Sequence, residues 1–166
     1  MFIGWSSSEK QRICHQAINE ELSFESSLLD VGCGVGDFST YVNNYIGIDN
    51  HQRMIEEAIK KYPDKKFILS SLDDYSNSHD VVIACGVFNV LVNDNLKYIM
   101  ESAEKMASLA IKKVIFTLLS RHSETKQEGL YYYNPGEIFN KMKHRFQKVI
   151  LRHDYLPDDF LISIIK

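Results

Sequence analysis

The chain has 166 residues, of which 45% are hydrophobic and 25% charged, and its formal net charge is −3. This composition is that of an ordinary globular protein, and the length suits one domain with a full core. The weak negative charge gives no electrostatic reason to expect a nucleic-acid partner, and no apolar run approaches the roughly 20 residues that span a bilayer.

The cysteines and the first residues indicate the compartment. Cys14, Cys33 and Cys85 are too few for a disulfide framework, so we expect reduced thiols in a cytoplasmic protein. The chain does not open with a basic region followed by an apolar core, and we therefore expect no secretion signal.

In chain order, predicted helices alternate with predicted strands. The first helix is expected over residues 7–22, with a capping box from Ser6 to Glu9. Further helices are expected after residue 36 (short), over 51–62, over 94–108 and from Asn134-Pro135 onward; strands are expected at 28–31, 45–48, 66–69, 79–85, 114–119, 149–151 and 160–165. The alternation predicts an α/β fold with a mainly parallel sheet covered on both faces, and the last two strands predict a terminal hairpin.

The most informative segment is the first strand with the glycine loop that follows it, Leu28 to Gly36 (LLDVGCGVG). A strand, a glycine loop and a helix together form a nucleotide site of the Rossmann type. The second strand ends in Asp49, where a carboxylate suits a pair of ribose hydroxyls.

The glycine spacing distinguishes between cofactors. Dinucleotide sites show G-x-G-x-x-G, but this chain places Asp37 where the third glycine would stand, and a carboxylate there repels a pyrophosphate. Asp30, just before the loop, suits a cationic amine. A ligand with a ribose at one end and an ammonium group at the other fits best, and S-adenosylmethionine (SAM) has that shape. An NAD-dependent oxidoreductase is the disfavoured alternative.

These residues resemble motif I of the class I SAM-dependent methyltransferases, and Asp49 resembles the acidic ribose clamp of that family. The resemblance covers nearly the whole chain, because the terminal hairpin also matches. It implies a three-layer, doubly wound, mostly parallel seven-stranded sheet with an antiparallel C-terminal hairpin. It also implies a methyltransferase (EC 2.1.1.-) in one domain, 1–166, with residues 1–24 as a helical segment over the active site and 25–166 as the Rossmann-like core. Gly4-Trp5 with Gln11, and the segments 133–137 and 154–160, resemble a small bacterial-type group.

The resemblance implies roles for individual residues. Asp30 would accept from the α-ammonium of the cofactor and Asp49 from both ribose hydroxyls. The family commonly has an acid after the third strand, near adenine, but Ser71 stands there, so the Ser71 hydroxyl, the Leu72 backbone and Asp73 remain alternatives. The expected cofactor set is Asp30, Gly32, Cys33, Gly34, Asp49, Asn50, Met54, Ser71, Leu72, Cys85 and Gly86.

The end of the fourth strand is where the family separates cofactor from acceptor. The acceptor-side candidates are Trp5, Phe88, Asn89, Tyr131 and Tyr133, and each of them also has an ordinary packing interpretation. A structural thiol is the favoured interpretation of Cys85, because no histidine is paired with it in the sequence. No catalytic residue is identified beyond His122 as a candidate base, and no histidine has metal-ligand spacing.

Two motifs that are absent from the sequence narrow the range of possible acceptors. No Asn- or Asp-Pro-Pro-aromatic run follows the fourth strand and no Pro-Cys pair occurs, which argues against methylation of nucleic-acid bases. A small-molecule acceptor is therefore favoured, with no membrane partner. The alternatives are a non-catalytic SAM-binding regulatory or partner subunit and a protein-modifying methyltransferase, and a homodimer is left open.

Overall fold

The structure is a computed structural model that describes residues 7–23 and 26–166. Seven strands form one sheet in the order β3-β2-β1-β4-β5-β7-β6. Their bounds are β1 Leu28–Val31, β2 Tyr45–Asp49, β3 Lys66–Leu69, β4 His79–Ala84, β5 Ala110–Leu119, β6 Lys148–Arg152 and β7 Asp159–Ile165. The strands from β1 to β5 pair in parallel, whereas β7 is antiparallel to both β5 and β6. The predicted fold class, with its antiparallel hairpin, is confirmed.

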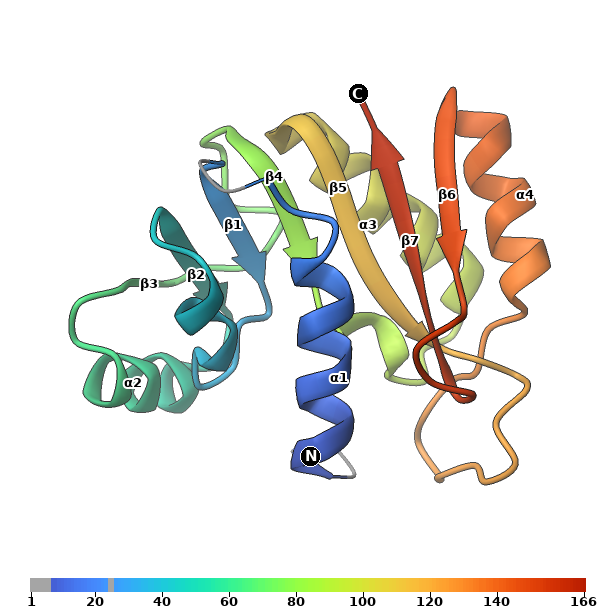
Figure 1. Cartoon of the computed structure of the whole chain (residues 1–166), viewed down its shortest axis with the longest axis horizontal. Helices are drawn as coiled ribbons and strands as arrows, with labels where there is room; N and C mark the ends of the chain where they lie inside the picture. Colours follow the sequence, from blue (N-terminus) through green and yellow to red (C-terminus); the bar gives the residue numbers. More distant parts are fainter. Residues whose placement is uncertain (1–6, 24–25) are drawn as a thin grey trace.

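Four α-helices cover the two faces of this sheet in the described part of the chain, and so give three layers. They are α1 Ser8–Asn19, α2 Gln52–Lys61, α3 Asn95–Leu109 and α4 Pro135–Arg145. Buried side chains of α1 and α2 pack into one apolar cluster with one face of the sheet, and those of α3 and α4 pack into a second cluster with the other. In Figure 1, α1 crosses in front of the sheet, and α3 lies behind it. No helix among the described residues has both the length and the apolar character needed to cross a bilayer.

The helix boundaries differ from the predicted ones where polar side chains compete for the first turn. The N-cap of α1 is Ser7, whose Oγ accepts from the amide of Lys10 at 3.2 Å. The cap is therefore one residue later than predicted, and Ser6 lies outside the described residues. The predicted start of α4 is confirmed, because Asn134 Oδ1 accepts from the amide of Glu137 at 3.2 Å and Pro135 occupies the first turn.

Two further elements differ in extent. The helix after the glycine loop is a short 3-10 helix, η1 Asp37–Tyr41, and a second short one, η2 Val87–Asn89, follows β4. Strand β5 begins at Ala110, four residues before the predicted start, because Ala110 pairs with His79 of β4. The lysines at this end of the strand form ion pairs, Lys112 with Asp80 and Lys113 with Glu21.

The topology determines where a ligand can bind. The strand order reverses direction between β1 and β4, and in parallel sheets the crevice at such a reversal lies beyond the carboxyl ends of the strands. The glycine loop, the end of β2 with Asp49, and the end of β4 with Cys85 all lie at this edge.

The glycine loop is also tied to the sheet by packing at Gly36. This residue has φ = +80°, and an added Cβ would come within 2.5 Å of the Phe67 ring. We expect Gly36→Ala to lower the free energy of unfolding by roughly 2–4 kcal/mol, the sum of left-handed strain and overpacking. Urea denaturation measures the loss.

Gly129 provides the matched control. It has the same φ of +80°, but no atom lies within 4 Å of an added Cβ. Gly129→Ala should therefore show the backbone strain alone, about 1–2 kcal/mol. Equal losses for the two variants would contradict the packing role of Gly36.

Candidate active site

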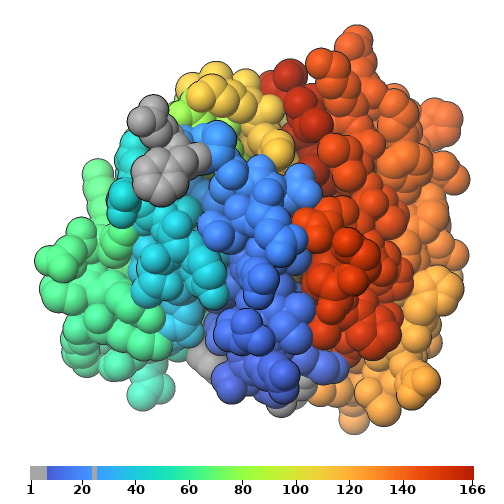
Figure 2. All heavy atoms as spheres, in the orientation of Figure 1, coloured from blue at the N-terminus to red at the C-terminus, as the bar shows by residue number. Residues whose placement is uncertain are grey.

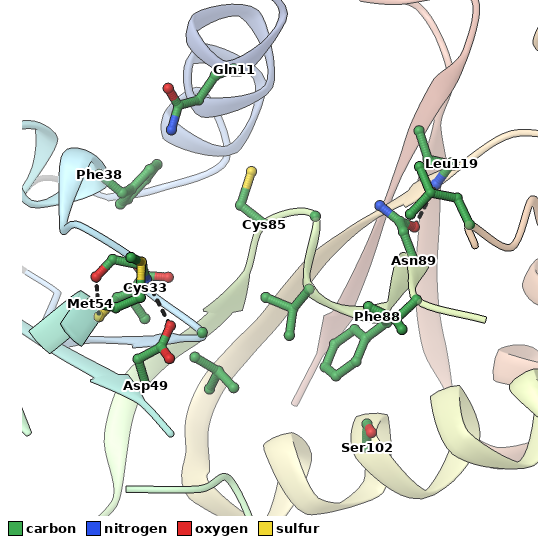
Figure 3. A pocket seen from close by; sticks show the side chains of 18 of the residues that line it. Gln11, Cys33, Phe38, Asp49, Met54, Cys85, Phe88, Asn89, Ser102 and Leu119 are labelled. Carbon is green, nitrogen blue, oxygen red and sulfur yellow. Dashed lines mark hydrogen bonds between the residues drawn. The ribbon is translucent and has the colours of Figure 1, made fainter. Parts of the chain in front are cut away.

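A cavity of about 1030 Å³ runs along the carboxyl edge of the sheet. Its walls are formed by the glycine loop, the ends of β2, β3 and β4, helix α1, parts of the 125–132 segment and the turn before β7. All of the predicted cofactor residues line it: Asp30, Gly32, Cys33, Gly34, Asp49, Asn50, Met54, Ser71, Leu72, Cys85 and Gly86. In Figure 3, Cys85 lies between the group of Cys33, Asp49 and Met54 on one side and Asn89 with Leu119 on the other.

The Asp49 carboxylate is held by two backbone amides. Its Oδ2 accepts from the N–H of Gly34 at 3.0 Å, as Figure 3 shows, and its Oδ1 accepts from the N–H of His51 at 2.8 Å. A carboxylate oxygen has a second acceptor site, so both oxygens can still accept from a ligand. The residue predicted to hold a ribose is thus fixed in orientation by the glycine loop and by the start of α2.

The second acid, Asp30, is 3% exposed at the end of β1. Burial raises the pKa of its carboxyl to about 7, with a smaller contribution from Asp49, against the opposing effect of the Tyr45 hydroxyl, which donates to Oδ2 at 2.7 Å. A cation that binds next to Asp30 would stabilise the charged form and lower this pKa.

Between these two acids the glycine loop leaves room for a ligand. Gly34 has φ = +55°, and no atom lies within 4 Å of an added Cβ. The backbone can therefore be approached closely from the cavity.

Asp37, the residue that distinguishes this loop from a dinucleotide site, has three hydrogen-bond donors. Lys61 and the Tyr62 hydroxyl donate to Asp37 Oδ1 at 2.5 and 2.9 Å, and Gln11 of α1 donates to Oδ2 at 3.4 Å. Burial alone would raise the pKa of Asp37, but the Lys61 and Tyr62 hydrogen bonds outweigh it and lower the pKa. Asp37 is therefore a carboxylate at neutral pH.

The three alternatives at the adenine position are placed differently. The Ser71 hydroxyl donates to Asp74 Oδ2 at 2.6 Å and accepts from the Asp74 amide at 3.2 Å, so it is engaged within its own turn. Leu72 is half-buried against the core and Asp73 is exposed, and both line the cavity.

The wall beyond β4 is built from Cys85, Phe88 and Asn89, which all line the cavity. Phe88 is 1% exposed, and Asn89 Oδ1 accepts from the amide of Leu119 at 2.9 Å, so both also stabilise the turn after β4. The hydroxyl of Thr117 donates to the Cys85 sulfur at 3.8 Å, and burial raises the pKa of the Cys85 thiol. Cys85 is therefore a protonated thiol at neutral pH and not an activated nucleophile.

Comparison with known proteins adds the family. Residues 29–108 match the family model described as "Methyltransferase domain". Residues 29–108 thus carry a methyltransferase domain, and the seven-stranded sheet has the class I, SAM-dependent methyltransferase architecture. No protein with a curated description matches the sequence.

Solved structures share the fold of this methyltransferase. Magnesium protoporphyrin IX methyltransferase from Synechocystis PCC 6803, with bound SAH, has a TM-score of 0.72 at 14% identity, over 99% of this chain and 90% of that one. A possible histamine N-methyltransferase from Thermotoga maritima has a TM-score of 0.69 at 15% identity, over 95% and 93%. The N-methyltransferase NodS from Bradyrhizobium japonicum WM9 has a TM-score of 0.68 at 13% identity, over 95% and 96%. At these identities the likeness concerns the fold.

Four of the predicted acceptor-side or catalytic residues are not placed at the cavity of the methyltransferase. Trp5 lies outside the described residues. Tyr131 and Tyr133 are in ring contact at 4.7 Å and do not line the cavity, and the Tyr133 hydroxyl donates to the carbonyl of Phe88 at 2.7 Å. Successive side chains of an extended segment point to opposite sides, so it is Tyr132 that reaches the cavity. The exposed His122 does not line it either and faces the ring of His153 at 5.8 Å.

The sequence pattern missed the part of the cavity wall that α1 and the turn before β7 form. This wall consists of Lys10, Gln11 and His15 from α1, with Leu156, Asp158 and Asp159 from the turn before β7 and the start of β7. Figure 2 shows α1 (dark blue) between the segment near residue 40 (cyan) and the C-terminal hairpin (orange-red). The only signal in the sequence was the resemblance of the 154–160 segment and Gln11 to a small group of methyltransferases, which assigns no role to them.

The raised pKa of Asp30 predicts a pH-dependent stability. The pKa of about 7 in the fold is above the ordinary 3.8, so the unfolded chain loses this proton first and the free energy of unfolding falls between about pH 4 and 7. We expect Asp30→Asn to remove on the order of 2 kcal/mol of the loss that the wild type shows between pH 5 and 8. Urea denaturation at both pH values tests this, and an unchanged slope would contradict it.

The position of Asp49 predicts its effect on cofactor affinity. Asp49→Ala should weaken binding of S-adenosylhomocysteine (SAH) at least about 30-fold, because two charge-assisted hydrogen bonds are lost. It should also lower the free energy of unfolding by about 1–3 kcal/mol, because the Gly34 and His51 amides lose their acceptor.

Calorimetry measures both the affinity and the fold of this variant. Asp64→Ala, in the exposed turn after α2, is the control and should bind SAH like the wild type. Unchanged SAH affinity in folded Asp49→Ala would show that the ribose is bound elsewhere.

Proposed function

We propose that this methyltransferase transfers a methyl group from SAM to a small-molecule acceptor bound against the wall formed by α1 and the turn before β7. The observation that carries the proposal is one continuous cavity whose lining includes Asp30, the glycine loop and Asp49 together with α1 and Asp159. SAM supplies a methyl group that its sulfonium already activates.

The residues at the glycine-loop end match the chemistry of this cofactor. Asp49 would accept from the two ribose hydroxyls, and Asp30 would hold the α-ammonium group. The open space before Gly34 would admit the ribose and methionine part, and Leu72 with Met54 would give apolar contact to the adenine.

The remaining residues would bind and orient the acceptor. Because the methyl group is already activated, most of the rate enhancement comes from holding the nucleophile in line with it. The end of β4, at Cys85 and Gly86, would separate the two ligands, and a neutral amine would need no base from the protein. His15, which burial keeps neutral by lowering its pKa to about 4, would help α1 to exclude water.

A small acceptor is favoured over a protein by the shape of the site. In our proposal the chain is one domain in which the N-terminal segment, 1–24, covers the Rossmann-like core, 25–166. Side chains of α1 and of the 125–132 segment line this same cavity. The similar solved structures include an enzyme named for magnesium protoporphyrin IX, a small molecule.

Parallel calorimetric titrations with SAM, SAH and NAD test the cofactor first. We expect micromolar affinity for SAM and SAH, which is about −8 kcal/mol, and none for NAD. Binding of NAD alone, or of none of the three, would overturn the proposal.

Turnover is then tested by measuring the SAH that forms from SAM in the presence of each member of a panel of small amines, phenols and thiols. SAH formation with any of them excludes a non-catalytic binding subunit. Tight SAM binding with no turnover on the panel, but methylation of a protein substrate, would favour the protein-modifying alternative.

A further inference from the structure

A second buried carboxyl group lies at the acceptor end of the cavity. Asp159, the first residue of β7, is 2% exposed and lines the cavity. The hydroxyl of Tyr155 donates to its Oδ1 at 2.5 Å, and the Cys14 thiol is a second, weak donor to the carboxyl, but in the described part of the chain Oδ2 has no hydrogen-bond partner of its own. Burying a carboxylate oxygen without a hydrogen-bond partner costs free energy. Its presence in the wall of a cavity therefore indicates a ligand that supplies the missing partner.

The fold brings this carboxyl to the cavity. Asp159 pairs with Leu119 at the carboxyl end of β5, next to the crevice, and Leu156 and Asp158 of the preceding turn line the same wall. Helix α1 adds Lys10, which forms an ion pair with Asp158. The segment 154–160, which resembles a small group of methyltransferases, therefore contributes to this site.

No protein cation neutralises Asp159 directly. The titratable groups around it are the Tyr155 hydroxyl, the Cys14 and Cys85 thiols, Asp158 and Lys10. Lys10 is bonded to Asp158, whose Oδ1 is also buried without a partner among the described residues. The thiols are protonated because burial raises the pKa of both. The carboxyls of Asp158 and Asp159 thus have a single neighbouring cation, Lys10, and the site lacks a second positive charge.

The cofactor does not supply this charge. Asp30 and Asp159 both raise the pKa of the Cys85 thiol by their charge, so the two carboxyls lie within electrostatic reach of the same sulfur. The single α-ammonium group of SAM is assigned to Asp30 in the proposed function. The Asp159 carboxyl therefore remains available to bind the acceptor.

We propose that Asp159 binds an ammonium group of a small-molecule acceptor whose methyl-accepting atom is a different one, and that it makes this methyltransferase selective for cationic small molecules. The inference rests on the proposed function, which assigns the other end of the cavity to SAM. Burial raises the pKa of the Asp159 carboxyl to about 7, so its affinity for a cation should increase as the pH rises through that value.

Three probes that share a phenyl ring and differ in one polar group test this: phenethylamine, 2-phenylethanol and phenylacetate. Each is titrated calorimetrically into the protein saturated with SAH. We expect phenethylamine to bind at least about tenfold more tightly than the alcohol, and phenylacetate not to bind. The affinity for phenethylamine should rise several-fold from about pH 6 to 8, where the amine itself stays protonated.

Variants then assign the effect to Asp159. Asp159→Asn keeps the shape of the side chain and should bind phenethylamine at least about tenfold more weakly, with no pH dependence. Asp154→Asn, on the same hairpin but exposed and outside the cavity wall, should bind like the wild type. An unchanged SAH affinity shows that each variant is folded.

Several outcomes would overturn the inference. They are phenylacetate binding as well as phenethylamine, no binding of the amine at millimolar concentration, an affinity for the amine that is flat with pH in the wild type, and an unchanged affinity in Asp159→Asn. The pH series on the wild-type protein needs no variant, so it tests the inference even if Asp159→Asn does not fold. Titration of phenethylamine without SAH separates this inference from the proposed function: failure of SAH to bind overturns that function, while the amine site is still measured.

Discussion

The hydrogen bonds that join Asp49 to the backbone of two loops, the glycine loop after β1 and the turn after β2, are the interaction on which the site depends. The carboxylate accepts from Gly34 in the glycine loop and from His51 at the start of α2, so one side chain fixes the loop, the strand end and the helix relative to one another. A charged acceptor that bonds to two amides also costs little to bury in part, because its charge is shared with the backbone.

The same edge of the sheet holds two carboxyl groups that lack such compensation. Asp30 and Asp159 are both at least 97% buried, and burial raises the pKa of each to about 7. Each has one hydroxyl donor, Tyr45 or Tyr155, which orients the carboxyl without neutralising it. Above this pKa, each buried carboxylate lowers the free energy of unfolding. Sites that lower stability in this way are typical of binding residues, whose cost the ligand offsets when it binds.

Helix α1 closes the cavity because polar contacts anchor it at both ends. Near its start, Lys10 pairs with Asp158, and Gln11 donates to Asp37. Just beyond its end, Glu21 is paired with Arg152 of β6 and Lys113 of β5. Each such pair is worth little alone, but together with the buried face of Ala17 and Ile18 they hold the helix across the sheet. The segment after the glycine loop and the turn before β7 are thereby connected through one helix.

The sequence by itself determined the sheet, the cofactor end of the site and the kind of cofactor. These features depend on local signals: apolar runs that form buried strands, glycines that allow a positive φ, and acids such as Asp30 and Asp49 at strand ends, which parallel strands bring to the same edge. The tertiary structure alone decided the part of the wall that we assign to the acceptor. Asp159 and Lys10 are far apart in the chain, and only the antiparallel return of β7 beside β5 and the crossing of α1 bring them together. The sequence also could not tell which tyrosine of 131–133 faces the cavity, because that depends on the side from which the segment packs against Phe88.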